Sequence, residues 1–150
     1  MKFGLIGFGA WGRHHAAAIT RAEDAQLIAI ACKSEQTFAE AKKAYPGAAV
    51  HRDYTELIRS PDIEALDIVL PTYLHAEVGE KALLAGKHVL LEKPMALSVE
   101  ECDRLIAAVE SSGKVLSIGH EFRLSSQWGA IKEIIANGAV SYTHLRAHET

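Results

Sequence analysis

Three glycines with the spacing G-x-G-x-x-G lie between a short apolar run and an alanine-rich stretch at the start of the chain. The apolar run is residues 2–6, the glycines are Gly7, Gly9 and Gly12, and residues 13–21 have the composition of a helix. In a strand, turn and helix of this kind, the first glycine permits the tight turn, the second lets a pyrophosphate approach the backbone, and the third allows close helix packing. The pattern predicts dinucleotide binding, and the alternative is a turn whose glycines serve only structure.

Predicted strands and helices alternate along the rest of the chain. Apolar runs too short for helices predict strands, and stretches with apolar residues at helical spacing predict helices between them. Asp53 and Glu56 have the spacing of a capping box before one short helix. The predicted strands are residues 26–32, 65–70, 87–91 and 115–118, and the predicted helices are residues 34–44, 53–60, 74–85, 98–111 and 124–137. Since helical crossovers join parallel neighbours, we expect an α/β fold with a Rossmann-like, doubly wound, mostly parallel sheet.

The end of the second predicted strand bears on the choice of cofactor. An acid is expected there, about 20 residues after the glycines, to bind the adenosine ribose hydroxyls. The chain has Cys32, Lys33 and Ser34 instead. A cation and a hydroxyl can bind a 2'-phosphate, which a carboxylate would repel, so the sequence favours NADP over NAD. In the alternative, Lys33 is a solvated residue, and Glu35 or backbone contacts hold NAD.

Two polar clusters follow neighbouring predicted strands. The first contains Pro71, Thr72, Tyr73 and His75, and the second contains Glu92, Lys93 and Pro94. Ligands bind outside the carboxyl ends of strands in open α/β sheets, so we expect both clusters to line one crevice. Lys93 can act as an electrophile or proton donor beside a substrate hydroxyl, tuned by burial and by Glu92; the alternative is a surface lysine. His75 fits a structural hydrogen bond as well as it fits a site.

Three segments, residues 7–12, 71–75 and 86–94, resemble the family of glucose-fructose oxidoreductase, inositol dehydrogenase and rhizopine-catabolism oxidoreductases (Gfo/Idh/MocA). The resemblance covers residues 1–138, and its most specific part is the sequence Glu-Lys-Pro that ends the third segment. It implies a nicotinamide-dependent dehydrogenase of sugars, cyclic polyols or their derivatives. It also implies that Lys93 is the catalytic lysine, touching substrate and cofactor, and that a cis peptide bond precedes the proline.

The predicted site has one catalytic residue, Lys93, and no metal ligand. Arg123 is included because the resemblance implies that it lies near the cofactor or the domain boundary; the alternative is a solvated arginine. Trp11 either packs beside the cofactor or makes an apolar contact at the start of its helix. The predicted cofactor-binding residues are Gly7, Phe8, Gly9, Ala10, Trp11, Gly12, Cys32, Lys33, Ser34, Pro71, Thr72, Tyr73, His75, Glu92, Lys93 and Arg123.

The domain organisation follows from the resemblance and from the end of the chain. We expect residues 1–119 to form the dinucleotide-binding domain, and residues 120–138 to begin a substrate and oligomerisation domain. Residues 140–150 have no amphipathic period and match the translation of a transposon-end sequencing adapter, so we interpret residues 139–150 as non-native. On this interpretation the family's substrate-binding half is missing, the chain alone is inactive, and helix 124–137 exposes apolar side chains.

Composition excludes several other classes. The chain has 16 Lys and Arg against 19 Asp and Glu, a net charge of −3, with no basic block to bind nucleic acid. No apolar run approaches the roughly 18 residues of a membrane span. Cys32 and Cys102 lack metal or redox spacing, and this cysteine use favours a cytoplasmic protein. For the parent enzyme that the resemblance implies, we expect a homo-oligomer with a small-molecule substrate; the alternative is a non-catalytic nucleotide-binding sensor or partner protein.

Overall fold

The computed structural model of the chain describes residues 1–138. The chain divides into two compact units, residues 1–119 and a second unit that begins at His120. The roles expected for these parts stay predictions, and the expected non-native tail, residues 139–150, lies outside the described residues.

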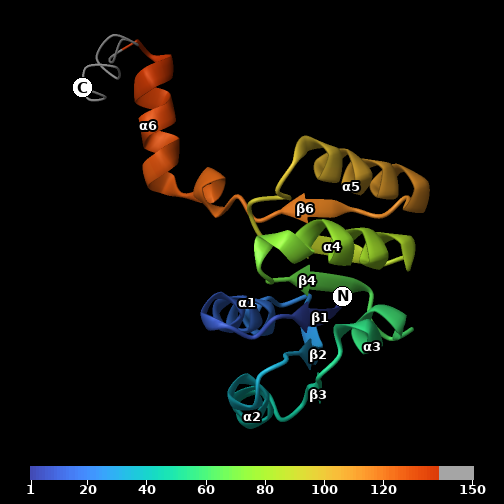
Figure 1. The fold of residues 1–150 in the computed structure, drawn as a ribbon. Helices are drawn as coiled ribbons and strands as arrows, with labels where there is room; N and C mark the ends of the chain where they lie inside the picture. The colour runs from blue at the N-terminus through green and yellow to red at the C-terminus, as the bar shows by residue number, and fades with distance from the viewer. Residues whose placement is uncertain (139–150) are drawn as a thin grey trace. The chain divides into compact units, whose positions relative to one another are not determined.

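Six strands of the first unit form one sheet in the order β3-β2-β1-β4-β5-β6, and all neighbouring pairs are parallel (Figure 1). The strands are β1 (Lys2–Ile6), β2 (Gln26–Ala31), β3 (Ala49–His51), β4 (Ala65–Ile68), β5 (His88–Leu91) and β6 (Leu116–Ile118). The helices are α1 (Ala10–Arg21), α2 (Glu35–Ala44), α3 (Tyr54–Arg59), the short 3-10 helix η1 (Thr72–Leu74), α4 (His75–Leu84) and α5 (Val99–Ser112). The predicted Rossmann-like fold is confirmed.

The two faces of the sheet carry separate apolar cores. Leu66 and Ile68 of β4 belong to a cluster that includes residues of α3, α4 and α5, whereas Leu5 of β1 and Ile30 of β2 belong to a second cluster with residues of α1 and α2. Side chains alternate between the faces of a strand, so Asp67, between Leu66 and Ile68, lies on the α1 side. This alternation places a charged residue of a central strand beneath the helix that follows the glycine loop.

One strand was missed in the sequence, and one predicted capping box is wrong. Strand β3 was not predicted, because three residues at the edge of the sheet give too short an apolar signal. Asp53 caps α3, but its carboxylate accepts a hydrogen bond from the amide of Thr55 at 2.9 Å, which is the local bond that Asp commonly makes two residues on. The Glu56 carboxylate lies 2.8 Å from His51 Nδ1, so the predicted capping box does not form.

The order of the strands fixes where a ligand can bind. The connections run from β1 outward to β2 and β3, and then return to β4 and continue to β5 and β6 on the other side of β1. The carboxyl ends of β1 and β4 therefore border the crevice at which open α/β sheets bind ligands. The glycine loop follows β1, and the two predicted polar clusters follow β4 and β5.

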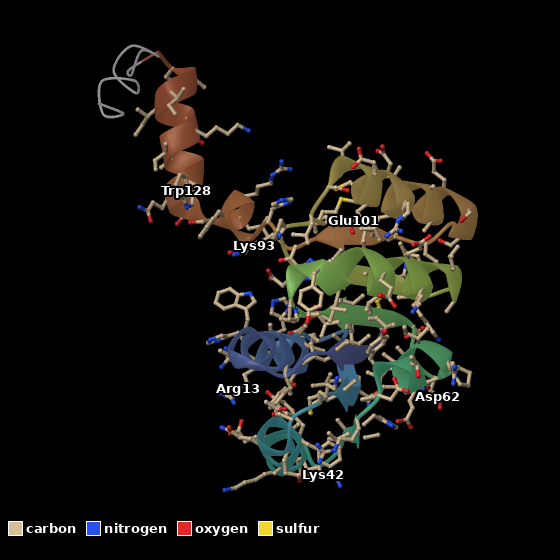
Figure 2. All side chains as sticks on the ribbon, viewed as in Figure 1. Arg13, Lys42, Asp62, Lys93, Glu101 and Trp128 are labelled. Atoms are coloured by element: carbon tan, nitrogen blue, oxygen red, sulfur yellow. The ribbon has the colours of Figure 1, made fainter. Side chains whose placement is uncertain are left out.

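The second unit contains the 3-10 helix η2 (Glu121–Leu124) and the helix α6 (Ser126–Ala136). Apolar side chains project from α6, including that of Trp128 (Figure 2). Trp128 is 48% exposed, and Ile131, Ile134 and Ile135 are exposed as well, which confirms the expected apolar surface. Within residues 1–138, no helix combines the length and the apolar character needed to cross a bilayer.

Candidate active site

The glycine loop has two glycines that the fold itself requires and one that it does not. Gly7 has a φ of +102°, and a Cβ there would lie 2.0 Å from the carbonyl oxygen of Val69; a Cβ on Gly12 would lie 2.1 Å from the carbonyl oxygen of Gly7. Gly9 has a φ of −78°, and a Cβ there would meet no protein atom within 4 Å. Since neither packing nor backbone conformation requires Gly9, its place in the motif matches the predicted approach of a pyrophosphate, and the loop fits a dinucleotide.

The other residues of the loop face in different directions. The side chain of Phe8 is buried and packs edge-on against Tyr45, with 5.8 Å between ring centroids. Only the backbone of Phe8 is therefore available to a cofactor. Trp11 begins α1 with Ala10, is 48% exposed, and donates a hydrogen bond from Nε1 to Glu92 Oε1 at 3.0 Å. Trp11 can still pack beside a cofactor or make an apolar contact at the start of α1. The hydrogen bond that holds its indole, however, goes to a carboxylate.

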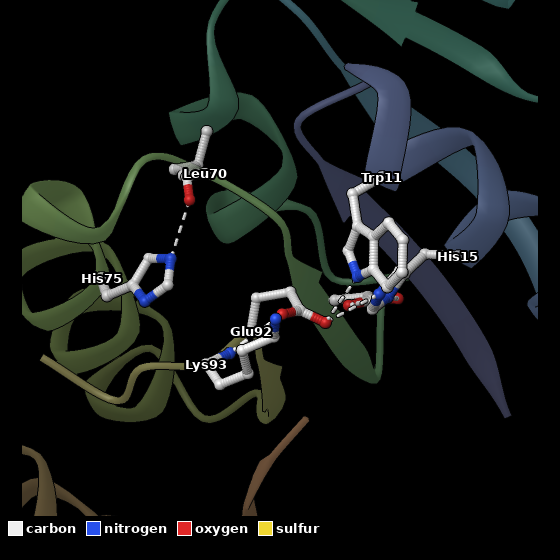
Figure 3. Close-up of polar contacts among 7 residues, drawn as sticks. Trp11, His15, Leu70, His75, Glu92 and Lys93 are labelled. Atoms are coloured by element: carbon white, nitrogen blue, oxygen red, sulfur yellow. Dashed lines mark hydrogen bonds and ion pairs between the residues drawn. The ribbon is translucent and has the colours of Figure 1, made fainter. Parts of the chain in front are cut away.

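The partly buried His15 and the buried carboxylates of Asp67 and Glu92 lie beneath the loop, and we call these three residues the buried group. His15 Nδ1 is 2.8 Å from Asp67 Oδ2, and His15 Nε2 is 3.1 Å from Glu92 Oε1. Figure 3 shows His15 and Trp11 reaching the Glu92 carboxylate together. Asp67 is 1% exposed and Glu92 is 7% exposed. Because a buried charge without a partner costs free energy, each carboxylate depends on these hydrogen-bond partners. One imidazole thus joins two buried carboxylates, one in β4 and one directly after β5.

The environment shifts the pKa values of two members of this group. The hydrogen bond to Asp67 is the largest cause that raises the pKa of His15, and the charges of Asp67 and Glu92 add to it. Desolvation by burial raises the pKa of Asp67, against the opposing effect of His15. Protonated His15 is the form that these two carboxylates favour.

Glu92 also holds the backbone of Lys93. Glu92 Oε2 accepts a hydrogen bond from the Lys93 amide at 3.0 Å, and a Cβ on Gly119 would lie 3.0 Å from Glu92 Oε1. The Lys93–Pro94 peptide is cis, as expected. The Lys93 side chain is exposed, with Nζ 5.9 Å from the centroid of the Trp11 ring. One carboxylate therefore contacts both the residue at the start of α1 and the predicted catalytic lysine.

These groups border a pocket of about 240 Å³ lined by Trp11, Val69, Leu70, Glu92 and Lys93. Its walls combine an indole ring and two aliphatic residues with an ammonium and a carboxylate. Such a lining suits a small ligand with an apolar face and polar edges. The pocket lies at the carboxyl ends of β4 and β5 and includes Glu92 and Lys93 of the second predicted cluster. No residue of the first cluster lines it, and Val69 and Leu70, which the prediction did not include, take that place.

His75 lies outside this lining. It is 1% exposed, and its Nε2 lies 2.8 Å from the Leu70 carbonyl oxygen (Figure 3). Its Nδ1 lies 2.7 Å from the Pro94 carbonyl oxygen. The ring therefore joins the loop after β4 to the loop after β5. This geometry favours the structural alternative for His75, which positions both loops around the pocket.

The remaining predicted residues fall into three places. Cys32 is buried at the end of β2, where desolvation raises the pKa of its thiol; Lys33 is exposed; and the Ser34 hydroxyl caps α2 by accepting from Thr37 N at 3.1 Å. Pro71, Thr72 and Tyr73 lie at η1, and Tyr73 is 66% exposed. Arg123 is exposed on η2 in the second unit. Their contacts with a cofactor stay predictions.

Three residues of interest were not singled out in the sequence. His15 lies in an alanine-rich helix next to His14, and nothing in that pattern separates the two. Asp67 gave a usable signal, since it is a lone acid inside the apolar run 65–70. Arg52 follows β3, the strand that was not predicted.

Comparisons with known proteins agree with the dinucleotide-binding fold. Residues 1–120 match a family, GFO_IDH_MocA, described as an oxidoreductase family with an NAD-binding Rossmann fold. The chain is 36% identical to 1-carboxy-3-chloro-3,4-dihydroxycyclo hexa-1,5-diene dehydrogenase of Comamonas testosteroni, over 92% of this chain and 35% of the relative. It is 30% identical to scyllo-inositol 2-dehydrogenase (NADP(+)) of Bacillus subtilis, over 93% and 38%.

A solved structure shows the same fold. Apo scyllo-inositol dehydrogenase from Lactobacillus casei superposes with a TM-score of 0.84 and 29% identity, covering 94% of this chain and 42% of that one. The chain thus spans roughly two fifths of the length of these proteins, which are 35%, 38% and 42% covered.

Proposed function

The chain belongs to the Gfo/Idh/MocA oxidoreductase family, and from this premise we propose that it is the dinucleotide-binding part of an enzyme that moves hydride between NADP or NAD and a secondary alcohol of a sugar or cyclic polyol. The observation that carries the proposal is the pocket in which Trp11, Glu92 and Lys93 meet beside a glycine loop that fits a dinucleotide. The bound nicotinamide supplies the hydride chemistry, and the protein supplies binding, orientation and electrostatics.

Each part of the chain has a role in this proposal. The backbone of the glycine loop and the first turn of α1 bind the pyrophosphate. Lys93 lies at the substrate hydroxyl and exchanges a proton with it. Glu92 fixes the backbone of Lys93 and the indole of Trp11, so that both stay at the pocket.

The substrate class rests on the names of relatives together with the lining of the pocket. One relative is named for a dihydroxycyclohexadiene and two others for inositol, and all of these compounds carry hydroxyl groups on a six-membered ring. A ring of this kind presents an apolar face and hydroxyl edges, which match an indole beside an ammonium and a carboxylate. The oligomeric state and cytoplasmic location expected for the parent enzyme remain part of the proposal.

The first test is calorimetric titration of the chain with NADPH and with NADH under identical conditions. Binding of either supports the proposal, and tighter binding of NADPH supports the choice of cofactor. The variant Gly9→Ala should weaken binding by about tenfold or more, because its Cβ enters the space of the pyrophosphate while leaving the protein's own packing intact.

Gly47→Ala is the matched control, since a Cβ there also meets no atom within 4 Å but lies far along the chain from the loop. It should bind as the unmodified chain does. If neither dinucleotide binds, or if both glycine variants bind equally well, the proposed function is wrong.

The role of Lys93 requires turnover, and so a protein of the family's full length that carries this domain. There, Lys93→Met should abolish turnover while the dinucleotide Kd changes by less than about threefold, because the ammonium acts on the substrate hydroxyl. Unchanged turnover would reject this role.

A further inference from the structure

A second polar group lies where β2 and β3 end, on the opposite side of the glycine loop from the pocket. The Cys32 amide donates to the carbonyl oxygen of His51 at 3.0 Å, so the two strands end side by side. Arg52 follows at once, and its Nη1 donates to the carbonyl oxygen of Lys33 at 3.1 Å. The pairing of β3 with β2 therefore brings an arginine to the residues predicted to bind the adenosine ribose.

The Arg52 guanidinium is held in a defined orientation. Its Cζ lies 4.0 Å from the centroid of the Phe38 ring of α2, and its Nη2 forms an ion pair with the Glu35 carboxylate. Stacking on an aromatic ring and a hydrogen bond to a carbonyl both restrict the side chain, which is nevertheless 43% exposed. An arginine that is ordered before binding loses less conformational entropy when it takes an anion.

This cluster is connected to the glycine loop. The Gly7 amide donates to the carbonyl oxygen of Ala31 at 2.9 Å, one residue before Cys32. In a doubly wound sheet, a dinucleotide on the glycine loop extends its adenosine ribose to the end of the second strand. The ribose of a bound dinucleotide would thus meet residues 32–34 and the guanidinium that lies against them.

The charges of the cluster favour an anion larger than a carboxylate. Lys42 Nζ lies 4.7 Å from the centroid of the Phe38 ring on which Arg52 stacks, Lys33 is exposed, and the acid paired with Arg52 is Glu35. Glu35 is 85% exposed as a side chain and lies at the start of α2, so water can solvate it when it leaves Arg52. No acid stands at residues 32–34, where the ribose-binding acid is expected, and Cys32 is buried there.

We propose that Arg52 is the residue that selects NADP(H) over NAD(H), by exchanging the Glu35 carboxylate for the 2'-phosphate of the cofactor. This inference rests on the proposed function. A 2'-phosphate carries about −1.5 to −2 charge and three acceptor oxygens, which the planar guanidinium can meet with two parallel hydrogen bonds. Lys33 is the second cation at the phosphate, and Glu35 opposes its binding.

The test compares Kd values of the chain for NADPH and NADH, and for adenosine 2',5'-bisphosphate and AMP as probes of the ribose end alone. Arg52→Met keeps an apolar stem against Phe38 but removes the charge, and should weaken both 2'-phosphorylated ligands by at least about tenfold. NADH and AMP should change by less than about twofold. Arg52→Lys keeps the charge without the planar guanidinium, and its Kd for the 2'-phosphorylated ligands should lie between those of the unmodified chain and of Arg52→Met.

Glu35→Gln should change the affinity for NADPH in the opposite direction. Removing the competing carboxylate should tighten NADPH by about twofold to fivefold and leave NADH unchanged. Arg104→Met is the matched control, because Arg104 on α5 is an exposed arginine near a glutamate, Glu80, and is 54% exposed. It should leave all four Kd values unchanged.

Several outcomes overturn the inference. NADPH binding that is the same in Arg52→Met and the unmodified chain rejects it, as does an equal loss in Arg52→Met and Arg104→Met. Weaker NADH binding in Glu35→Gln would mean that Glu35 binds the adenosine ribose, and it would also reject the role of Arg52. Failure of the unmodified chain to bind any dinucleotide rejects the proposed function itself, and is thus distinguishable from failure of the role of Arg52.

Discussion

The two ends of the candidate cofactor site are built in opposite ways. At the end formed by α1, β4 and β5, the buried carboxylates of Asp67 and Glu92 both contact the partly buried imidazole of His15. At the end formed by β2 and β3, Arg52 and Glu35 are exposed and paired at the surface. Under the proposed function, the two ends have different tasks. The buried carboxylate of Glu92 holds Trp11 and the backbone of Lys93 at the pocket, and the exposed pair can exchange partners at low cost when a ligand binds.

The largest effect should come from removing the imidazole that joins the buried carboxylates. His15→Ala leaves Asp67 without its partner in the interior and should lower the free energy of unfolding by about 3 kcal/mol. Urea denaturation followed by circular dichroism measures this value. His14→Ala, an exposed neighbour on α1, should change it by less than about 0.5 kcal/mol. Equal losses in both variants would remove the contrast between the two ends.

The pH dependence of stability should come next. The pKa of His15 is raised, chiefly by its hydrogen bond to Asp67, so from about pH 6.5 upward the folded chain binds more protons at this site than the unfolded chain. This contribution to stability is complete below about pH 6.5 and is lost as the pH rises through the native pKa of His15, with a slope of at most about 1.4 kcal/mol per pH unit.

The matched variant for this slope is Asp67→Asn, which keeps the shape of the side chain but removes the charge that faces His15. The fall in stability above pH 6.5 should become shallower in this variant, with only Glu92 left to favour the imidazolium. Denaturation curves at several pH values provide the measurement. A slope that is unchanged in Asp67→Asn would show that the buried group does not control it.

A smaller loss of stability is expected at Trp11, a half-exposed residue that contacts the buried group through Glu92. Trp11→Phe keeps an aromatic ring but removes the Nε1 hydrogen bond to Glu92, and should lower the free energy of unfolding by about 1 kcal/mol. The same denaturation assay measures it. A loss as large as that of His15→Ala would place Trp11 inside the buried group rather than at its edge.

The smallest effect on stability should be at the exposed end. Arg52→Met breaks a surface ion pair and should change the free energy of unfolding by less than about 0.5 kcal/mol, although it is expected to change NADPH binding strongly. A loss above 1.5 kcal/mol would mean that the β2–β3 end is fixed in the same way as the buried end, and the contrast would fail.

The sequence predicted the fold from features that are local. The glycine spacing, the apolar runs and the helix stretches lie close together along the chain, and each corresponds to an element of the sheet or its helices. Strand β3 was missed because Ala49–His51 pairs with the edge of the sheet through only three residues. A strand of that length has almost no periodicity of its own.

The site could be predicted only in part, because its contacts join distant segments. Lys93 and Trp11 stood in recognisable motifs, but His15 of α1 reaches Asp67 of β4 and Glu92 after β5 only in the folded sheet. Arg52 reaches Lys33 only because β3 pairs with β2. Spacing along the chain identifies residues that stand in motifs, whereas contacts between distant segments depend on the order of the strands in the sheet.

The indole of Trp11 gives this protein a built-in optical reporter. Trp11 lines the pocket, and Trp128 is the only other tryptophan in the chain, on α6 in the second unit. The emission of an indole depends on the charges and dipoles around it, and that of Trp11 has a carboxylate at its N–H and an ammonium near its ring. A ligand that enters the pocket changes those surroundings, so emission from a Trp128→Phe variant can follow occupancy of the pocket without any added label.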